Sequence, residues 1–202
     1  LDKNGYKILY YASLAPSGHN SQPWFVKINS RLDWVIGSNL ARCLKTVDDR
    51  NRETLLSLGA FVENLVQAAG KFGYAVETKV IAKDRFDPDV VKIHLSKSKA
   101  KDISLQRMVM RRTVKSHLQS KELRSSDVND FSKSVDGHLF YFPRGTDHAD
   151  FMNKAAVKNY MIQADNKKAR EELAFWIRLK DSEAKKFRDG LTPDGMEITG
   201  QV

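Results

Sequence analysis

Near the N-terminus the chain reads Ala15-Pro16-Ser17-Gly18-His19-Asn20-Ser21-Gln22-Pro23-Trp24. This segment is dense in hydroxyl and amide groups that can bond the edge of a ligand. Gly18 lets the backbone approach a ligand closely, and Pro16 and Pro23 fix where the loop begins and ends. Such a segment is also compatible with a plain helix-to-strand turn whose polar side chains bond their own backbone, and the composition alone leaves both interpretations open.

The segments around this loop alternate between helical and extended patterns. Apolar spacing predicts a first helix before the loop and strands after it. A long helix over 49–72 carries apolar residues around much of its circumference, so we expect it to be buried on several sides, at the centre of the domain or of a subunit interface. The predicted strands are 24–28, 33–36, 74–82, 90–95 and 138–142, and the other predicted helices are 4–15, 103–110, 125–133, 147–164 and 166–179.

A second motif, Arg111-Arg112-Thr113 followed by Lys115, concentrates positive charge at the end of a predicted helix. Arginine binds phosphate through a planar fork, whereas lysine acts as a point charge. A neighbouring hydroxyl adds a further hydrogen bond, so the group suits a phosphate monoester. Paired arginines are common, and a solvated charge run is the alternative interpretation.

The composition of the chain limits its cellular location and the kinds of partner that it can have. The 202 residues carry a net charge of +9 and a single cysteine, Cys43, which cannot form a disulfide within the chain. We therefore expect a cytoplasmic location, without a secretion leader and without a membrane partner, because no apolar stretch is long enough to span a bilayer. A basic balance also fits a nucleic-acid binder, but the aromatic residues are not interleaved with the basic runs, and we predict no nucleic-acid partner.

Together, the two motifs resemble those of the flavin-dependent nitroreductases. The first is similar to the family's Ala-Pro-Ser-x-x-Asn-x-Gln-Pro-Trp loop, which contacts the FMN ring and ribityl chain. The second is similar to the Arg-Arg-Ser/Thr-x-Arg element that holds the FMN phosphate, although Lys115 replaces the usual arginine and His117-Leu118 departs from the usual ending. The resemblance implies an α+β nitroreductase fold, with a central mixed or antiparallel sheet flanked by helices and a long buried core helix.

The order of the two motifs is reversed relative to ordinary nitroreductases and resembles the Acg-like, two-half branch. Ordered markers around Arg52-Glu53, Glu172-Leu173 and Asp189-Gly190 continue that likeness. It implies a first half over 1–95, a linker over 96–102 and a second half over 103–202. Branch members usually continue well beyond the Asp-Gly marker, so on this resemblance the second half is truncated.

The resemblance also implies an activity. We expect an enzyme that passes hydride from NAD(P)H through FMN to nitroaromatic or quinone acceptors, in a ping-pong cycle and with a homodimer as one form of assembly. The flavin carries this chemistry, so we predict no catalytic side chain and no metal. The expected cofactor-binding residues are Pro16, Ser17, Gly18, Asn20, Gln22, Arg111, Arg112, Thr113 and Lys115. The alternative is a flavin-binding or flavin-sequestering protein without turnover.

Overall fold

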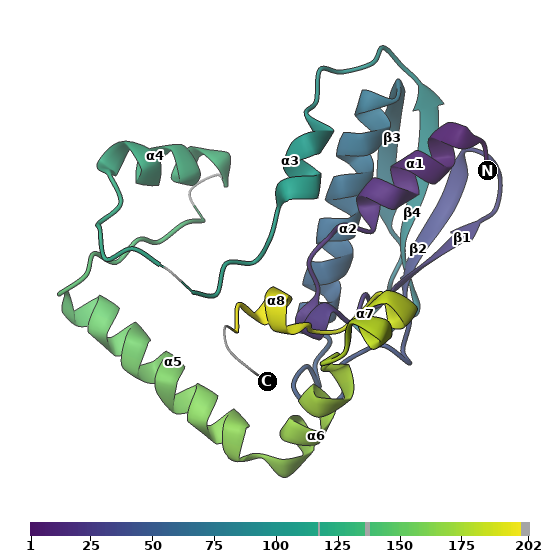
Figure 1. The fold of residues 1–202 in the computed structure, drawn as a ribbon. Helices are drawn as coiled ribbons and strands as arrows, with labels where there is room; N and C mark the ends of the chain where they lie inside the picture. Colours follow the sequence, from purple (N-terminus) through teal and green to yellow (C-terminus); the bar gives the residue numbers. More distant parts are fainter. Residues whose placement is uncertain (117, 136–137, 199–202) are drawn as a thin grey trace. The chain divides into compact units, whose positions relative to one another are not determined.

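The computed structural model describes residues 1–116, 118–135 and 138–198. The chain divides into two compact units, one made of 1–113 with 171–202 and the other of 114–170. Figure 1 follows the chain from the N-terminal helix to the last helix. Residues 96–102 lie inside the first unit, and the predicted division into two ancestral halves stays a prediction.

The first unit is an α+β layer structure built on a four-stranded antiparallel sheet. The strands are β1 (Trp24–Ile28), β2 (Asp33–Ser38), β3 (Tyr74–Val80) and β4 (Asp89–Lys97). Their order across the sheet is β1-β2-β4-β3. All pairings are antiparallel, with Trp34 opposite Ile93 and Val76 opposite Leu95. The predicted strands are therefore confirmed within the first unit, and the sheet is antiparallel rather than mixed.

Two helices, α1 (Lys3–Ala12) and α2 (Arg52–Lys71), pack together, and α2 lies against β2 and β3 (Figure 1). Because side chains alternate across a strand, Trp34, Ile36 and Ile93 pack with Phe61 and Leu65 of α2 in one core. The opposite sheet face carries exposed polar residues such as Lys27, Lys92 and His94. One sheet face thus carries the core and the other faces solvent.

Helix α2 is central, but it is buried on one face rather than on several sides. Its buried residues recur at the helical spacing Thr54, Ser57, Leu58, Phe61, Leu65, Ala68 and Ala69. Leu56, on the other face, is 74% exposed. Some of the apolar side chains around α2 are therefore not covered by any neighbour among the described residues.

The start of α2 is held by a residue that lies outside it. The carboxylate of Asp48 accepts the backbone N–H groups of Glu53 and Thr54 at 3.0 and 2.8 Å. A helix leaves its first N–H groups without partners, so this side chain supplies acceptors where they are needed. The helix begins at Arg52 rather than at the predicted residue 49.

The first unit also contains η1 (Gly18–Asn20), α3 (Leu105–Met110), α7 (Asp181–Phe187) and α8 (Pro193–Met196). The second unit holds α4 (Ser125–Ser134) and α5 (Asp147–Asp165), and α6 (Lys167–Trp176) begins in it and ends in the first. Residues 138–142, predicted as a strand, form none. No strand among the described residues of the second unit is available to pair with them, so their alternating pattern does not lead to a sheet.

Candidate functional site

The loop between α1 and β1 has an unusual backbone. His19, Asn20 and Gln22 all take positive φ angles, of 50°, 51° and 52°. Residues with side chains rarely adopt such angles, and their local cost is met by surrounding contacts. The Ser17 hydroxyl accepts the backbone N–H of Gln22 at 3.0 Å. The polar side chain of Ser17 therefore closes the loop on itself, as the plain-turn interpretation expects.

Gly18 is surrounded by the chain itself. A Cβ at this position would lie 2.7 Å from the Glu53 carboxylate and 2.9 Å from Leu44. A larger residue would therefore require the side-chain ends of Glu53 and Leu44 to shift. Gly18 thus lies in close contact with its own chain, whether or not the loop also receives a ligand.

Two amide side chains of the loop reach the C-terminal segment of the first unit. The side-chain N–H of Asn20 donates to the Gly190 carbonyl at 2.9 Å, and that of Gln22 donates to the Arg188 carbonyl at 2.6 Å. The Gly190 N–H in turn donates to the Asn20 carbonyl at 3.1 Å. The loop and residues 188–190, about 170 positions apart in sequence, therefore form one structural element.

Asp189 is the electrostatic centre of this element. Its carboxylate is bonded by Arg42 at 2.5 Å and by Arg178 at 2.8 Å, and its side chain is only 7% exposed. Arg42 also donates to the Ser21 carbonyl at 2.6 Å. One buried carboxylate and two guanidinium groups thus fix the loop, the segment before α2 and the C-terminal segment together.

Gly190, next to Asp189, needs a conformation that suits glycine. Its φ is +79°, and a Cβ there would collide with the Trp176 carbonyl. The Leu191 N–H donates to that same carbonyl at 2.8 Å. The two residues of the Asp-Gly pair therefore have different roles. Asp189 forms the ion pairs, and Gly190 allows the backbone to pass close to the Trp176 carbonyl.

The cationic motif lies at the end of α3 in the first unit. Arg111 Nη2 donates to the Leu14 carbonyl at 3.3 Å, across 97 positions of sequence. This contact brings Arg111 to the segment that leads into Pro16. Arg112 and Thr113 are exposed in the same unit, and no carboxylate of the described residues forms an ion pair with either arginine. Lys115 belongs to the second unit, and His117 lies outside the described residues.

An acidic group lies on the inner side of the loop. Partial burial, followed by repulsion from Asp48, raises the pKa of the Glu53 carboxyl above its usual range. Its carboxylate is the group nearest to the Cβ position of Gly18. Protonation of Glu53 therefore changes the charge directly beneath the loop.

Sequence reasoning missed the roles of Arg42, Arg178 and Glu53. Glu53, Asp189 and Gly190 belong to the markers of the family resemblance, but the resemblance did not predict their partners. Arg42 stands in no motif, and a lone arginine in a loop gives no sign of a carboxylate 147 positions away. Trp34 and Trp176 are both buried.

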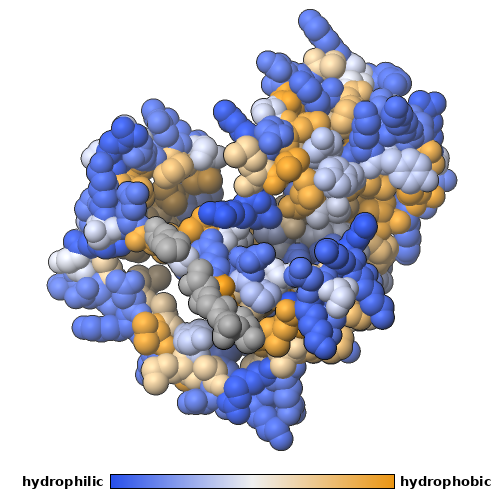
Figure 2. All heavy atoms as spheres, in the orientation of Figure 1, coloured by the Kyte–Doolittle hydropathy of each residue, from blue (hydrophilic) through white to orange (hydrophobic). Residues whose placement is uncertain are grey.

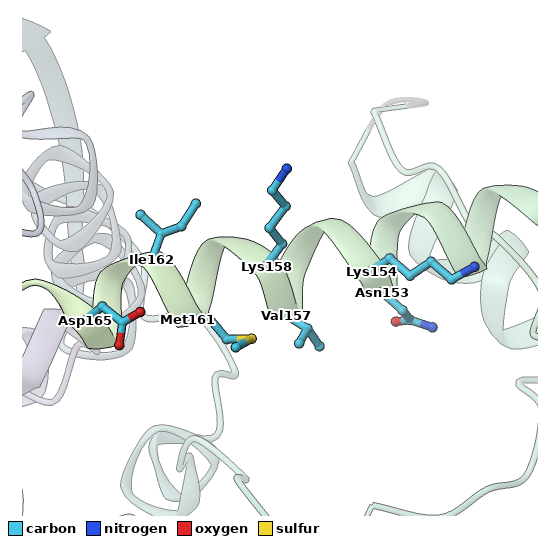
Figure 3. A pocket seen from close by; sticks show the side chains of 7 residues that line it. All are labelled: Asn153, Lys154, Val157, Lys158, Met161, Ile162 and Asp165. Atoms are coloured by element: carbon cyan, nitrogen blue, oxygen red, sulfur yellow. The ribbon is translucent and has the colours of Figure 1, made fainter.

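The second unit has a hollow of its own along α5, about 510 Å³ in volume. In Figure 3, Val157 and Met161 extend from one side of this helix, while Lys158 and Ile162 extend from the opposite side. All of the lining residues belong to α5, so the hollow has no second wall. A lining of this kind offers no convergent polar groups for a ligand.

Among the described residues, no cluster of three or more histidine, cysteine, aspartate or glutamate side chains is placed to hold a metal ion. None of the described helices combines the length and the apolar character that crossing a membrane requires.

No protein-family model matches the chain, and no curated protein matches it. Among solved structures, the chain is similar to a crystal structure of a nitroreductase-like protein from Streptococcus mutans. The two share 16% sequence identity over 57% of this chain and 89% of that chain, with a TM-score of 0.37. A TM-score this low does not establish a common fold, so the proposals below rest on the residues and contacts of this chain.

Proposed function

We propose that the chain is an FMN-dependent NAD(P)H oxidoreductase of the nitroreductase type. The observation that supports this best is the 3.3 Å contact between Arg111 and the Leu14 carbonyl. It brings the cationic motif beside the amide-rich loop, as binding the two ends of one flavin nucleotide requires. The motifs themselves supply the resemblance, and the contact supplies their proximity.

The residues present fit such a cofactor in two respects. Arg111 and Arg112 are exposed and have no carboxylate partner among the described residues, so a phosphate monoester can bond to them. Asn20 and Gln22 donate through their amide nitrogens, which leaves their amide oxygens as acceptors for N–H groups of a ring edge.

In this proposal Arg111, Arg112 and Thr113 bind the phosphate. Ser17, Asn20 and Gln22 orient the ring, while Pro16 and Gly18 set the path of the loop. When bound, FMN supplies hydride and electron transfer between NAD(P)H and a nitroaromatic or quinone acceptor. The buried Asp189 group keeps the loop in place during that exchange.

The proposal is tested by the absorbance spectrum of the purified chain and by FMN titration. We expect tight, stoichiometric FMN binding in the wild type and a loss of at least about ten-fold in affinity in Arg111→Ala/Arg112→Ala, because charge-assisted hydrogen bonds are removed. Lys79→Ala/Lys92→Ala, on the open face of the sheet, removes the same charge and is the matched control.

Turnover separates the enzyme from a flavin-holding protein. Oxidation of NADH or NADPH with menadione or a nitrofuran supports the enzyme, whereas FMN binding without oxidation supports sequestration. Unchanged FMN affinity in the double arginine variant would show that the phosphate assignment is wrong. Absence of FMN binding in the wild type would overturn the whole proposal.

A further inference from the structure

A second concave site lies between the start of α2 and the loop that joins β3 to β4. It is an open hollow of about 810 Å³, within the size range of small-molecule sites. Its cationic lining residues are Arg50, Arg52, Lys83 and Arg85. It shares no residue with the Ser17 loop or with the arginine motif, so the proposed flavin site does not account for it.

Within the described residues, none of these four cations forms an ion pair with a carboxylate. The two aspartates of the loop bond to backbone N–H groups instead. Asp87 accepts the backbone N–H groups of Lys83 and Asp84 at 2.5 and 3.3 Å, and Asp84, which also lines the site, accepts the N–H of Phe86 at 2.7 Å.

The two walls of the site are joined by a buried amide. Asn51 is 6% exposed, takes a left-handed φ of 52°, and donates through its side chain to the Arg85 carbonyl at 3.1 Å. Its own N–H donates to the Asp48 carbonyl at 2.9 Å. The backbone of the loop at Arg85 is therefore held beside the start of α2.

Apart from Asp84, the rest of the lining is apolar. It consists of Leu55, Val80, Ala82 and Val90. Three of the four cations are arginines, whose planar fork matches phosphate, and the apolar side chains offer a surface for a hydrocarbon moiety. No lining residue is aromatic, so the bases of a single-stranded nucleic acid would find no stacking partner.

We propose that this cavity, the α2–β3/β4 cavity, binds a small phosphomonoester whose other end is apolar. The phosphate is bound by the arginines, and the apolar end packs on Val80, Val90 and Leu55. The site is separate from the proposed flavin site, so each can exist without the other.

The probe is hexyl phosphate, titrated into the full chain by calorimetry, with inorganic phosphate and hexanol as its two halves. We expect hexyl phosphate to bind more tightly than either half and to shift the methyl NMR signals of Val80 and Val90. Equal binding of inorganic phosphate, or unmoved methyl signals, would overturn the proposal in favour of a merely charged surface.

The decisive variant is Arg50→Gln/Arg85→Gln, and its control is Lys79→Gln/Lys92→Gln, which lowers the net charge equally on the open face of the sheet. We expect affinity for hexyl phosphate to fall at least about ten-fold in the first, because charge-assisted hydrogen bonds are lost, and to change less than about two-fold in the second. Circular dichroism checks that both variants are folded, and an equal loss in both would overturn the assignment.

Two further measurements define the ligand class and the independence of the site. An oligothymidylate that binds more tightly than hexyl phosphate, and is weakened by the same arginine variant, would show a nucleic-acid surface instead. FMN affinity should be unchanged in Arg50→Gln/Arg85→Gln. A loss of FMN binding in that variant would show that the cavity is part of the flavin site.

Discussion

The two compact units differ in whether their apolar side chains are buried or exposed. In the first unit, the periods of α2 and of the strands place Phe61, Leu65, Ile36 and Ile93 in one core, each at most 2% exposed. In the second unit, the buried residues among those described are only Ala149 and Ala169. Apolar side chains are plentiful there but remain outside, as the orange surface residues of Figure 2 illustrate for the face it shows.

Helix α5 shows why the second unit differs. At 100° per residue, apolar side chains point in all directions around the helix, and all of them are exposed: Phe151, Met152, Val157, Tyr160, Met161 and Ile162. One neighbouring surface cannot cover such a helix. Apolar side chains therefore form a core only where another layer of secondary structure packs against them. In this chain, the sheet packs against α2 in this way.

The comparison predicts that stability resides in the first unit, and a matched pair of phenylalanines tests this most strongly. Phe61→Ala should lower the free energy of unfolding by about 3–5 kcal/mol, because it leaves a cavity between α2 and Trp24. Phe140→Ala, at a position 78% exposed in the second unit, should change it by less than about 0.5 kcal/mol.

Both phenylalanine variants are measured by urea unfolding followed by circular dichroism. Similar losses of unfolding free energy in the two variants would contradict this prediction, because they would show that the second unit has a core that contributes to stability. A loss confined to Phe61→Ala would support it.

A smaller effect is expected at the ion pairs that fix the loop. Asp189→Ala should cost about 2–3 kcal/mol, because it leaves Arg178 buried without its partner, while the partly exposed Arg42 can turn to water. The matched control is Asp89→Ala, which breaks the exposed pair with Lys27 and should cost less than about 1 kcal/mol.

Asp189→Ala also tests whether the first unit includes its C-terminal segment. We expect the NMR signals of the Asn20 and Gln22 side-chain amides to move, because these groups donate to the carbonyls of 188–190. Unchanged amide signals, or equal costs for the two aspartate variants, would mean that the segment is positioned by something other than Asp189.

The elements of the first unit were predictable because their signals are local. Alternation placed β1 and β3, and helical spacing placed α2. The expected strand over 138–142 was wrong because alternation cannot show whether a partner strand exists. The prediction that the loop and the arginine motif serve one ligand came from family resemblance, because a pattern within one motif does not show which residues 97 positions away lie near it.

The arrangement beneath the loop was not predictable for the same reason. Glu53 looks like any acidic residue in the first turn of a helix, where it is favoured by the helix dipole. Its closeness to Gly18 depends on how the loop folds back on α2. Arg42 and Asp189 are likewise ordinary residues until the fold brings them together.

The smallest expected effect concerns Glu53 and the pH dependence of the first unit. Partial burial and Asp48 raise the pKa of Glu53 above its ordinary value of 4.5, so the folded state holds this proton more tightly than the unfolded chain does. Stability is therefore greatest below the ordinary pKa and falls as the pH rises toward the folded-state pKa. Glu53→Gln removes this loss of stability. The difference in melting temperature between this variant and the wild type should therefore grow in favour of the variant as the pH rises from about 4 to about 7.

Glu63→Gln, an exposed position on the same helix, controls for the removal of one negative charge. A difference that stays constant with pH, or the same trend in Glu63→Gln, would show that the charge beneath Gly18 does not act on the stability of the loop and its core.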